Sequence, residues 1–157
     1  MIRKLIFAAT MLASTAALAA PARVFLNDAI KGDNSEITAG QYIASHGYSA
    51  QVRSFGRTLY RDHSMARGQA VAVARQLGMR PPTGTKPEAR AEMRRLHRLH
   101  GRAFDMEVRR GMIEDHRIDI AKFEAQARSG DPRTAALARR QLPTLRKHLR
   151  IAQSLRV

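Results

Sequence analysis

Apolar residues recur at alternating spacings of three and four along four separate stretches, and this pattern limits the fold more than any other feature. Such spacing gathers side chains on one face of an α-helix, because a helix turns once in about 3.6 residues. We expect the third stretch to bend or break near Gly101. The sequence therefore predicts an all-α fold whose four amphipathic helices span residues 23–46, 50–77, 88–128 and 133–155.

The connections between these stretches indicate how the helices pair. Residues 47–49 separate the first two helices, and residues 129–132, which end in Asp131-Pro132, separate the last two. Short connections make successive helices antiparallel. The segment 78–87 contains three prolines and begins a long crossover. We therefore expect a four-helix bundle of two antiparallel helical hairpins joined by a long crossover, in one domain over residues 22–156.

The first 19 residues have the pattern of a cleavable signal peptide. Arg3 and Lys4 precede an uncharged apolar run, and Ala17-Leu18-Ala19 forms a small-x-small cleavage motif. An N-terminal membrane anchor is the alternative, but the apolar run is short for a span of about 20 residues. No later segment is apolar enough to cross a membrane. The sequence predicts cleavage after Ala19 and a periplasmic or secreted protein.

The charge and the missing residue types exclude several functions. The chain of 157 residues has 28 basic and 13 acidic residues and a formal charge of +15. Export argues against nucleic acid as the partner, so anionic envelope components are the partners that this charge suggests. The absence of Cys excludes disulfides, thiolate catalysis and iron–sulfur clusters. No hydrolase elbow, phosphate loop or dinucleotide-binding motif occurs.

Each predicted helix places one ionisable residue in its otherwise apolar stripe. Burying such a group without a partner costs about 1–3 kcal/mol, which suggests that the four satisfy one another or a shared ion. Counted along the helices from the connecting turns, the two polar residues of each hairpin lie at nearly the same level. A carboxylate and three imidazoles suit Zn, Mn, Fe, Ni or Cu. The predicted ligands of one transition metal ion are Glu36, His63, His116 and His148.

Asp62 and Asp115 each directly precede one of these histidines. Neighbouring residues on a helix point about 100° apart, so each aspartate faces a flanking helix. There it could accept a hydrogen bond from an imidazole of the next helix and fix its tautomer, as an outer-shell residue of the metal site. The alternative is a buried His/Asp/Glu network without metal, and the residues alone leave both interpretations open.

Several motifs together resemble those of one exported bacterial family, the "domain of unknown function 4142" family. They are Phe55 through Asp62-His63, Gly101-x-x-Phe104-Asp105, Glu114-Asp115-His116 and Leu142-Pro143-Thr144-Leu145-Arg146-x-His148-Leu149. The resemblance covers residues 24–155, and it implies a ferritin-like four-helix bundle with the six polar residues above at the family's polar motif positions. The chain lacks the Glu-x-x-His pairs of carboxylate-bridged di-iron proteins, so that chemistry is poorly supported.

Two functions follow from these observations. The first is a periplasmic ferritin-like protein that binds a transition metal for metal handling or stress protection. The second is a non-catalytic structural or interaction protein of the envelope, in which a metal-free polar network fixes the helix register. An oxidase that uses the metal is a third and weaker hypothesis, and the sequence predicts neither a substrate nor an oligomeric state.

Overall fold

The computed structural model describes the backbone of residues 7–128 and 130–157 and the side chains of these residues from Ala20 onward. All regular secondary structure in this part of the chain is helical, which confirms the all-α prediction. The helices are α1 (Phe7–His46), α2 (Ala50–Gln76), α3 (Pro87–Leu96), α4 (Gly101–Ala127) and α5 (Pro132–Ser154).

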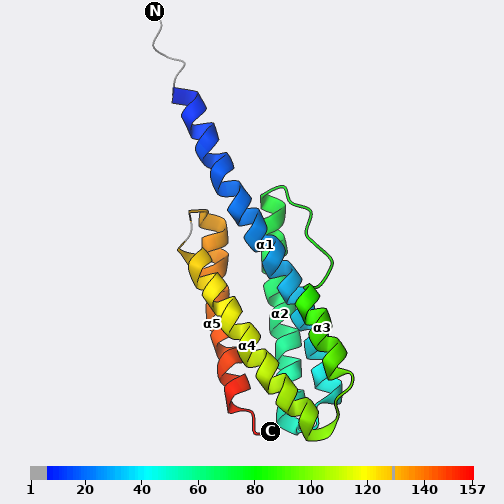
Figure 1. Ribbon diagram of the computed structural model, residues 1–157. Coiled ribbons are helices and arrows are strands. Elements are labelled where there is room, and N and C mark those ends of the chain that lie inside the picture. Colours follow the sequence, from blue (N-terminus) through cyan, green and yellow to red (C-terminus); the bar gives the residue numbers. More distant parts are fainter. Residues whose placement is uncertain (1–6, 129) are drawn as a thin grey trace, which may run out of the picture.

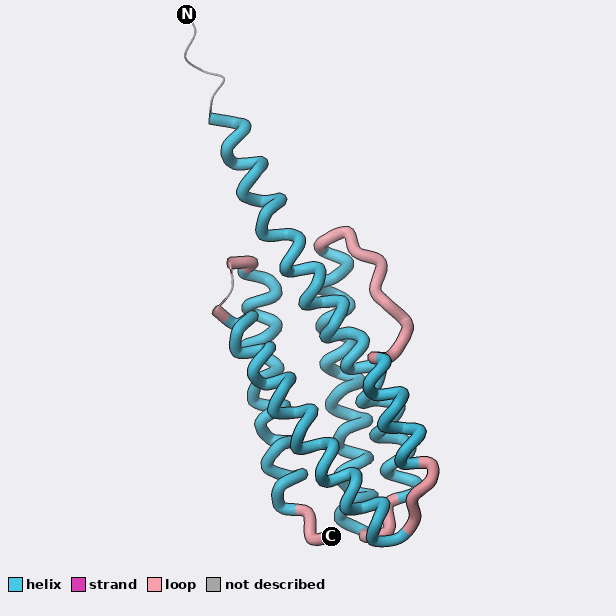
Figure 2. Tube along the Cα trace, viewed as in Figure 1, coloured by secondary structure: helices cyan, strands magenta, loops and turns pink. Residues whose placement is uncertain are grey.

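Four long helices form two antiparallel hairpins, α1 with α2 and α4 with α5 (Figure 1). α2 also packs against α5, so the hairpins lie face to face. The crossover carries the short helix α3, which packs against α4 and α1, and Figure 2 shows the loop that leads to it from the end of α2. The predicted hairpins and the long crossover are therefore present.

The third predicted helix, residues 88–128, is two helices in the structure. α3 ends at Leu96, and α4 begins at Gly101, whose φ of +58° lies in the left-handed region that favours glycine. His100 before it is extended and is the N-cap of α4. The break predicted near Gly101 is thus confirmed. Pro143, in contrast, lies inside α5, which continues to Ser154.

The predicted signal peptide lies partly outside the described residues, since these begin at Phe7. The described part of it belongs to α1, which continues through Pro21 and extends beyond the ends of the other helices (Figure 1). Its cleavage after Ala19 stays a prediction. None of the described helices combines the length and hydropathy that a membrane span requires.

Apolar clusters at the two ends of the bundle enclose a polar layer. One cluster contains Ile43, Phe55 and Phe104, and the clusters towards the other end contain Leu26 and Leu142. Between them along each long helix lie buried ionisable residues. The apolar packing therefore holds a layer of polar side chains at mid-height, away from solvent. The layer consists of Asp33, Glu36, Asp62, His63, His116 and His148.

Candidate metal centre

Three histidines from three helices meet in the polar layer. His63 of α2, His116 of α4 and His148 of α5 are at most 4% exposed. One ligand nitrogen from each lies within 4.8 Å of the others. Their rings are 5.1–5.9 Å apart between centroids. The two hairpins therefore bring together the three imidazoles that the sequence singled out, and their burial excludes bulk water as a partner.

Fixed acceptors determine the tautomers of two of these rings. His116 Nδ1 lies 2.9 Å from the carbonyl oxygen of Met112, which can only accept, so this nitrogen carries the proton. His148 Nε2 lies 3.0 Å from Asp62 Oδ2 and donates to that carboxylate. The lone pairs of His116 and His148 therefore reside on Nε2 and Nδ1, respectively.

These two lone-pair nitrogens, His116 Nε2 and His148 Nδ1, are 3.3 Å apart. With the tautomers above, neither nitrogen has a proton to donate to the other, so their approach is favourable only with a cation or an extra proton between them. Two nitrogens bound to one tetrahedral Zn²⁺ at about 2.0–2.1 Å are about 3.3–3.4 Å apart. The observed separation therefore fits a shared metal ion.

His63 supplies the third nitrogen. Its Nδ1 lies 2.9 Å from Asp33 Oδ1, and its Nε2 is buried without a hydrogen-bond partner. Burial lowers the pKa of His63, but the hydrogen bond to Asp33 and the charge of Glu36 outweigh it and raise the pKa overall. Without a metal, the ring thus forms an ion pair with Asp33 while its other nitrogen stays unpaired. A metal ion would displace a proton there.

His116 and His148 have the protonation state that metal binding requires, because a metal ligand must be a neutral imidazole. Burial, and secondarily the charge of His63, lower the pKa of His148 to about 4. The same two causes hold the pKa of His116 well below its usual range. Both rings are therefore neutral at pH 7 and have a lone pair available.

The carboxylate of Asp62 orients the His148 ring and is itself bound by two basic side chains. It also accepts from Lys147 at 2.5 Å and from Arg61 at 2.9 Å. Burial favours protonation of Asp62, but hydrogen bonds from Lys147, His148 and Arg61 outweigh it and keep its pKa far below the usual range. An ionised carboxylate that orients a ligating imidazole is the usual outer-shell arrangement of histidine metal sites.

The other predicted site residues lie near this centre in different roles. Glu36 is buried and interacts with the charge of His63, but it is not among the residues whose ligand atoms converge. Its Oε2 has no hydrogen-bond partner. Asp115 forms a hydrogen bond with the Glu92 carboxyl of α3 rather than with an imidazole. The acceptor on the third ring is instead Asp33.

Asp33 was not predicted, because the pattern of the first helix also fits an inward stripe of Phe25, Ala29, Gly32, Glu36, Ala39 and Ile43, whose spacings begin with four. In the structure, Leu26 and Ile30 are the fully buried apolar residues there. A stripe that begins at Leu26, with spacings that begin with three, contains both Asp33 and the buried Glu36. This alternative register was the signal that could have identified it. The stripe is Leu26, Ala29, Asp33, Glu36, Gly40 and Ile43.

A family model described as a domain of unknown function (DUF4142) matches residues 7–155. The chain matches no curated protein and no solved structure. The match covers the described helices and all three histidines, but its description assigns no activity. What the protein does must therefore be argued from the geometry above.

Proposed function

We propose, from the premise that the chain belongs to the DUF4142 family, that it is an exported protein that binds one transition metal ion at His63, His116 and His148. Its role would be metal handling or stress protection in the periplasm. The observation that carries the proposal is the convergence of three imidazoles, each of which has one ring nitrogen occupied by an oxygen acceptor.

The burial of all three rings favours holding a metal over converting a large substrate. The void that reaches His63 is lined also by Asp33 and Asp62, but not by His116 or His148, and has a volume of about 20 Å³. This is room for about one water molecule. Three neutral imidazoles and one water suit Zn, Cu, Fe or Ni. Because the three rings are buried, a fourth ligand would be a water or a similarly small molecule, which is compatible with storage, transfer or the removal of a small oxidant.

The second candidate is an envelope structural or interaction protein with a metal-free network. The observation that favours it is the pairing already present: His63 with Asp33, and Asp62 with both His148 and Lys147. In that case the polar layer would only fix how the hairpins pack. The nitrogens left facing each other at 3.3 Å count against it.

Metal content distinguishes the two candidates. The untagged protein, exported and purified, is analysed by elemental mass spectrometry, and we expect close to one transition metal per chain. His63→Gln, which keeps a similar size, should lose the metal, whereas the matched control His100→Ala changes an exposed histidine and should keep it. A wild-type protein that is isolated without metal, and takes none up from a Zn, Mn, Fe, Ni and Cu panel, would leave the structural role standing.

Export is tested separately by N-terminal sequencing of the protein from the periplasmic fraction. We expect the mature chain to begin at Ala20, because the small-x-small motif ends at Ala19. A chain that retains Met1 and stays with the membrane fraction would support the N-terminal anchor instead.

A further inference from the structure

A second polar region lies beside the histidines, in a cavity of about 270 Å³ between α1, α3 and α4. Six of the chain's 13 acidic residues line it, although the formal charge of the chain is +15. They come from all three helices and include one residue predicted as a metal ligand. The acidic residues of this cavity are Glu36, Glu88, Glu92, Glu114, Asp115 and Asp119.

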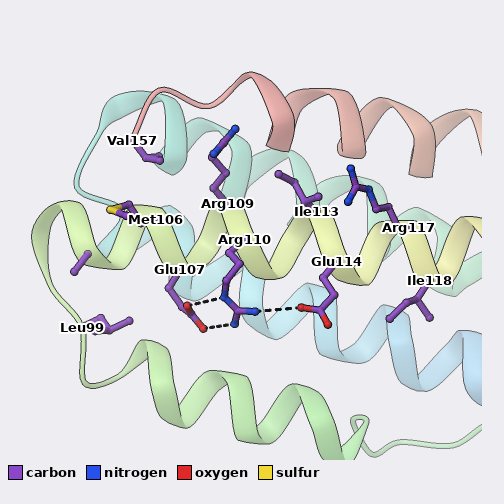
Figure 3. A pocket seen from close by; sticks show the side chains of 11 residues that line it. Leu99, Met106, Glu107, Arg109, Arg110, Ile113, Glu114, Arg117, Ile118 and Val157 are labelled. Atoms are coloured by element: carbon purple, nitrogen blue, oxygen red, sulfur yellow. Dashed lines mark hydrogen bonds and ion pairs between the residues drawn. The ribbon is translucent and has the colours of Figure 1, made fainter.

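Four basic residues also line this cavity, and each of them forms an ion pair with an acid other than Glu36, Glu92 and Asp115. Lys86 binds Asp119 at 3.3 Å and Asp28 at 3.4 Å. Arg110 is held between Glu107 at 2.6 Å and Glu114 at 3.1 Å, and dashed lines mark these pairs on α4 in Figure 3. Arg95 pairs with Glu107, and Lys122 pairs with Asp28. All four basic side chains therefore have an acidic partner, and two of these partners, Glu114 and Asp119, line the cavity themselves.

Among the described residues, four carboxyl groups of the cavity form no ion pair. One is Glu88, which is exposed; the other three are Glu36, Glu92 and Asp115, of which the last two share a hydrogen bond. Glu36 is only 7% exposed, lines the cavity, and has an Oε2 without a hydrogen-bond partner. Glu92 Oε1 is buried without a partner as well. An unsatisfied buried carboxylate oxygen is costly, and a bound cation removes that cost.

We propose that this acidic cavity binds a hydrated divalent cation through Glu36, Glu92 and Asp115. Oxygen ligands suit hard cations such as Mg²⁺, Ca²⁺ and Mn²⁺, which keep several waters when few carboxylates bind them. The cavity of about 270 Å³ has space for the ion and several waters of about 30 Å³ each. None of these three carboxylates belongs to the group of converging imidazoles, so the proposed site does not require a metal at the histidines.

Mn²⁺ is the probe, because it broadens the NMR signals of nearby backbone amides. The isotope-labelled full chain is titrated with Mn²⁺, as wild type and as the double variant His63→Ala/His116→Ala, which lacks the histidine centre. We expect amide signals around the cavity, such as that of Gly111, to broaden first in both proteins. If this selective broadening is lost in the histidine variant, the cation belongs to the histidines and the inference is wrong.

Three variants test the assignment in the wild-type background. Glu36→Gln/Glu92→Gln removes two carboxylates and should raise the apparent Kd for Mn²⁺ at least tenfold. Gly111→Ala removes no charge, but its Cβ would lie 1.8 Å from the present position of Glu92 Oε1 and displaces that carboxylate. It should also weaken binding. The control Glu124→Gln removes an acid that pairs with Arg146 away from the cavity, and it should have no effect.

Two results would overturn the inference. One is Mn²⁺ broadening without preference for the cavity in the wild type. The other is an equal loss of affinity in Glu124→Gln and in the double glutamine variant, which would show a general effect of charge. Absence of a transition metal at the histidines would refute the proposed function and leave this test unaffected, because the broadening is then read around the cavity alone.

Discussion

The histidine centre and the acidic cavity are adjacent in one bundle, yet they differ in how their unpaired atoms are held. At the histidine centre, every ring has one nitrogen fixed by an oxygen acceptor, and one ligand nitrogen of each ring lies within 4.8 Å of the others. The void that reaches His63 has a volume of only about 20 Å³. In the acidic cavity of about 270 Å³, the unpaired oxygens of Glu36 and Glu92 have no such fixed arrangement.

This difference teaches that burial alone does not define a binding site. Outer acceptors that fix each ligand make a rigid site that suits a tightly bound, largely dehydrated ion of the Zn or Cu kind. Flexible carboxylates around a larger space suit a hydrated ion that binds weakly. The predictions below test whether the two regions behave as separate sites of these two kinds.

The largest effect is expected from removing one imidazole. His116→Ala takes away a ligand that no neighbouring group can replace, so transition-metal affinity should fall by more than the roughly 100-fold typical of outer-shell changes. Competition with a chromophoric chelator measures this affinity. The same variant should keep Mn²⁺ affinity at the acidic cavity within about twofold. If His116→Ala lowers the transition-metal affinity and the Mn²⁺ affinity alike, the histidine centre and the acidic cavity form one site.

A smaller effect is expected from removing the charge of Asp62, whose carboxylate accepts a hydrogen bond from His148. Asp62→Asn keeps the size of the side chain but removes the charge that orients the ring, so metal affinity should fall about 10- to 100-fold. Asp105→Asn is the matched control. Asp105 is equally buried, but it accepts from the backbone N–H groups of Tyr48 and Ser49 at the start of α2.

The control should lower the thermal midpoint of unfolding without changing metal affinity, because its hydrogen bonds support the helix junction alone. If both variants lose affinity in proportion to their loss of stability, Asp62 is a structural residue. The orienting role would then be refuted.

The fold could be predicted from the sequence because periodicity and short turns are local features. The stripes through Phe55 and Leu145 indicated the buried faces of their helices, and the short connections at residues 47–49 and 129–132 indicated the hairpins. The break before Gly101 was visible as a glycine in a helical pattern. The position of α3 was not predictable, because the long crossover leaves its packing partner open.

The three histidines could be predicted as a group because each interrupts an apolar stripe at a similar level. Their partners were harder to predict, since a first stripe that begins at Leu26 instead of Phe25 has Asp33 instead of Gly32 as the inward residue. Glu92 was missed altogether. It lies on α3, so only the three-dimensional position of that helix shows that it meets Asp115.

The acidic cavity should make stability depend on pH. Burial, and secondarily the charge of Asp115, raise the pKa of Glu92 from its ordinary 4.5 to about 8. Between these pH values the folded chain binds more protons than the unfolded chain, so the free energy of unfolding falls as pH rises through this window. Glu92→Gln cannot ionise. The free energy of unfolding of the wild type should fall by about 1–2 kcal/mol between pH 6 and pH 9, and this decrease should be absent in Glu92→Gln. Urea unfolding measures it.

Glu88→Gln is the control for this experiment, since Glu88 lies on the same helix, lines the same cavity and is exposed. Its profile should follow that of the wild type. An unchanged profile in Glu92→Gln would mean that the buried carboxyl group of Glu92 does not respond to pH in this range. Added Mn²⁺ should restore part of the wild-type stability at pH 9, because it binds only the folded chain.

The smallest effect is expected from Glu36→Gln at the histidine centre, and it decides to which region Glu36 belongs. The sequence pattern predicted Glu36 as a fourth ligand beside the imidazoles, in which case its loss should cost more than about 100-fold in transition-metal affinity. In the structure Glu36 lines the acidic cavity and affects His63 only through its charge. If Glu36 acts on the centre only through its charge, the loss of that charge should change the transition-metal affinity only about threefold. Chelator competition resolves these two magnitudes, and the larger one would merge the two regions into a single centre.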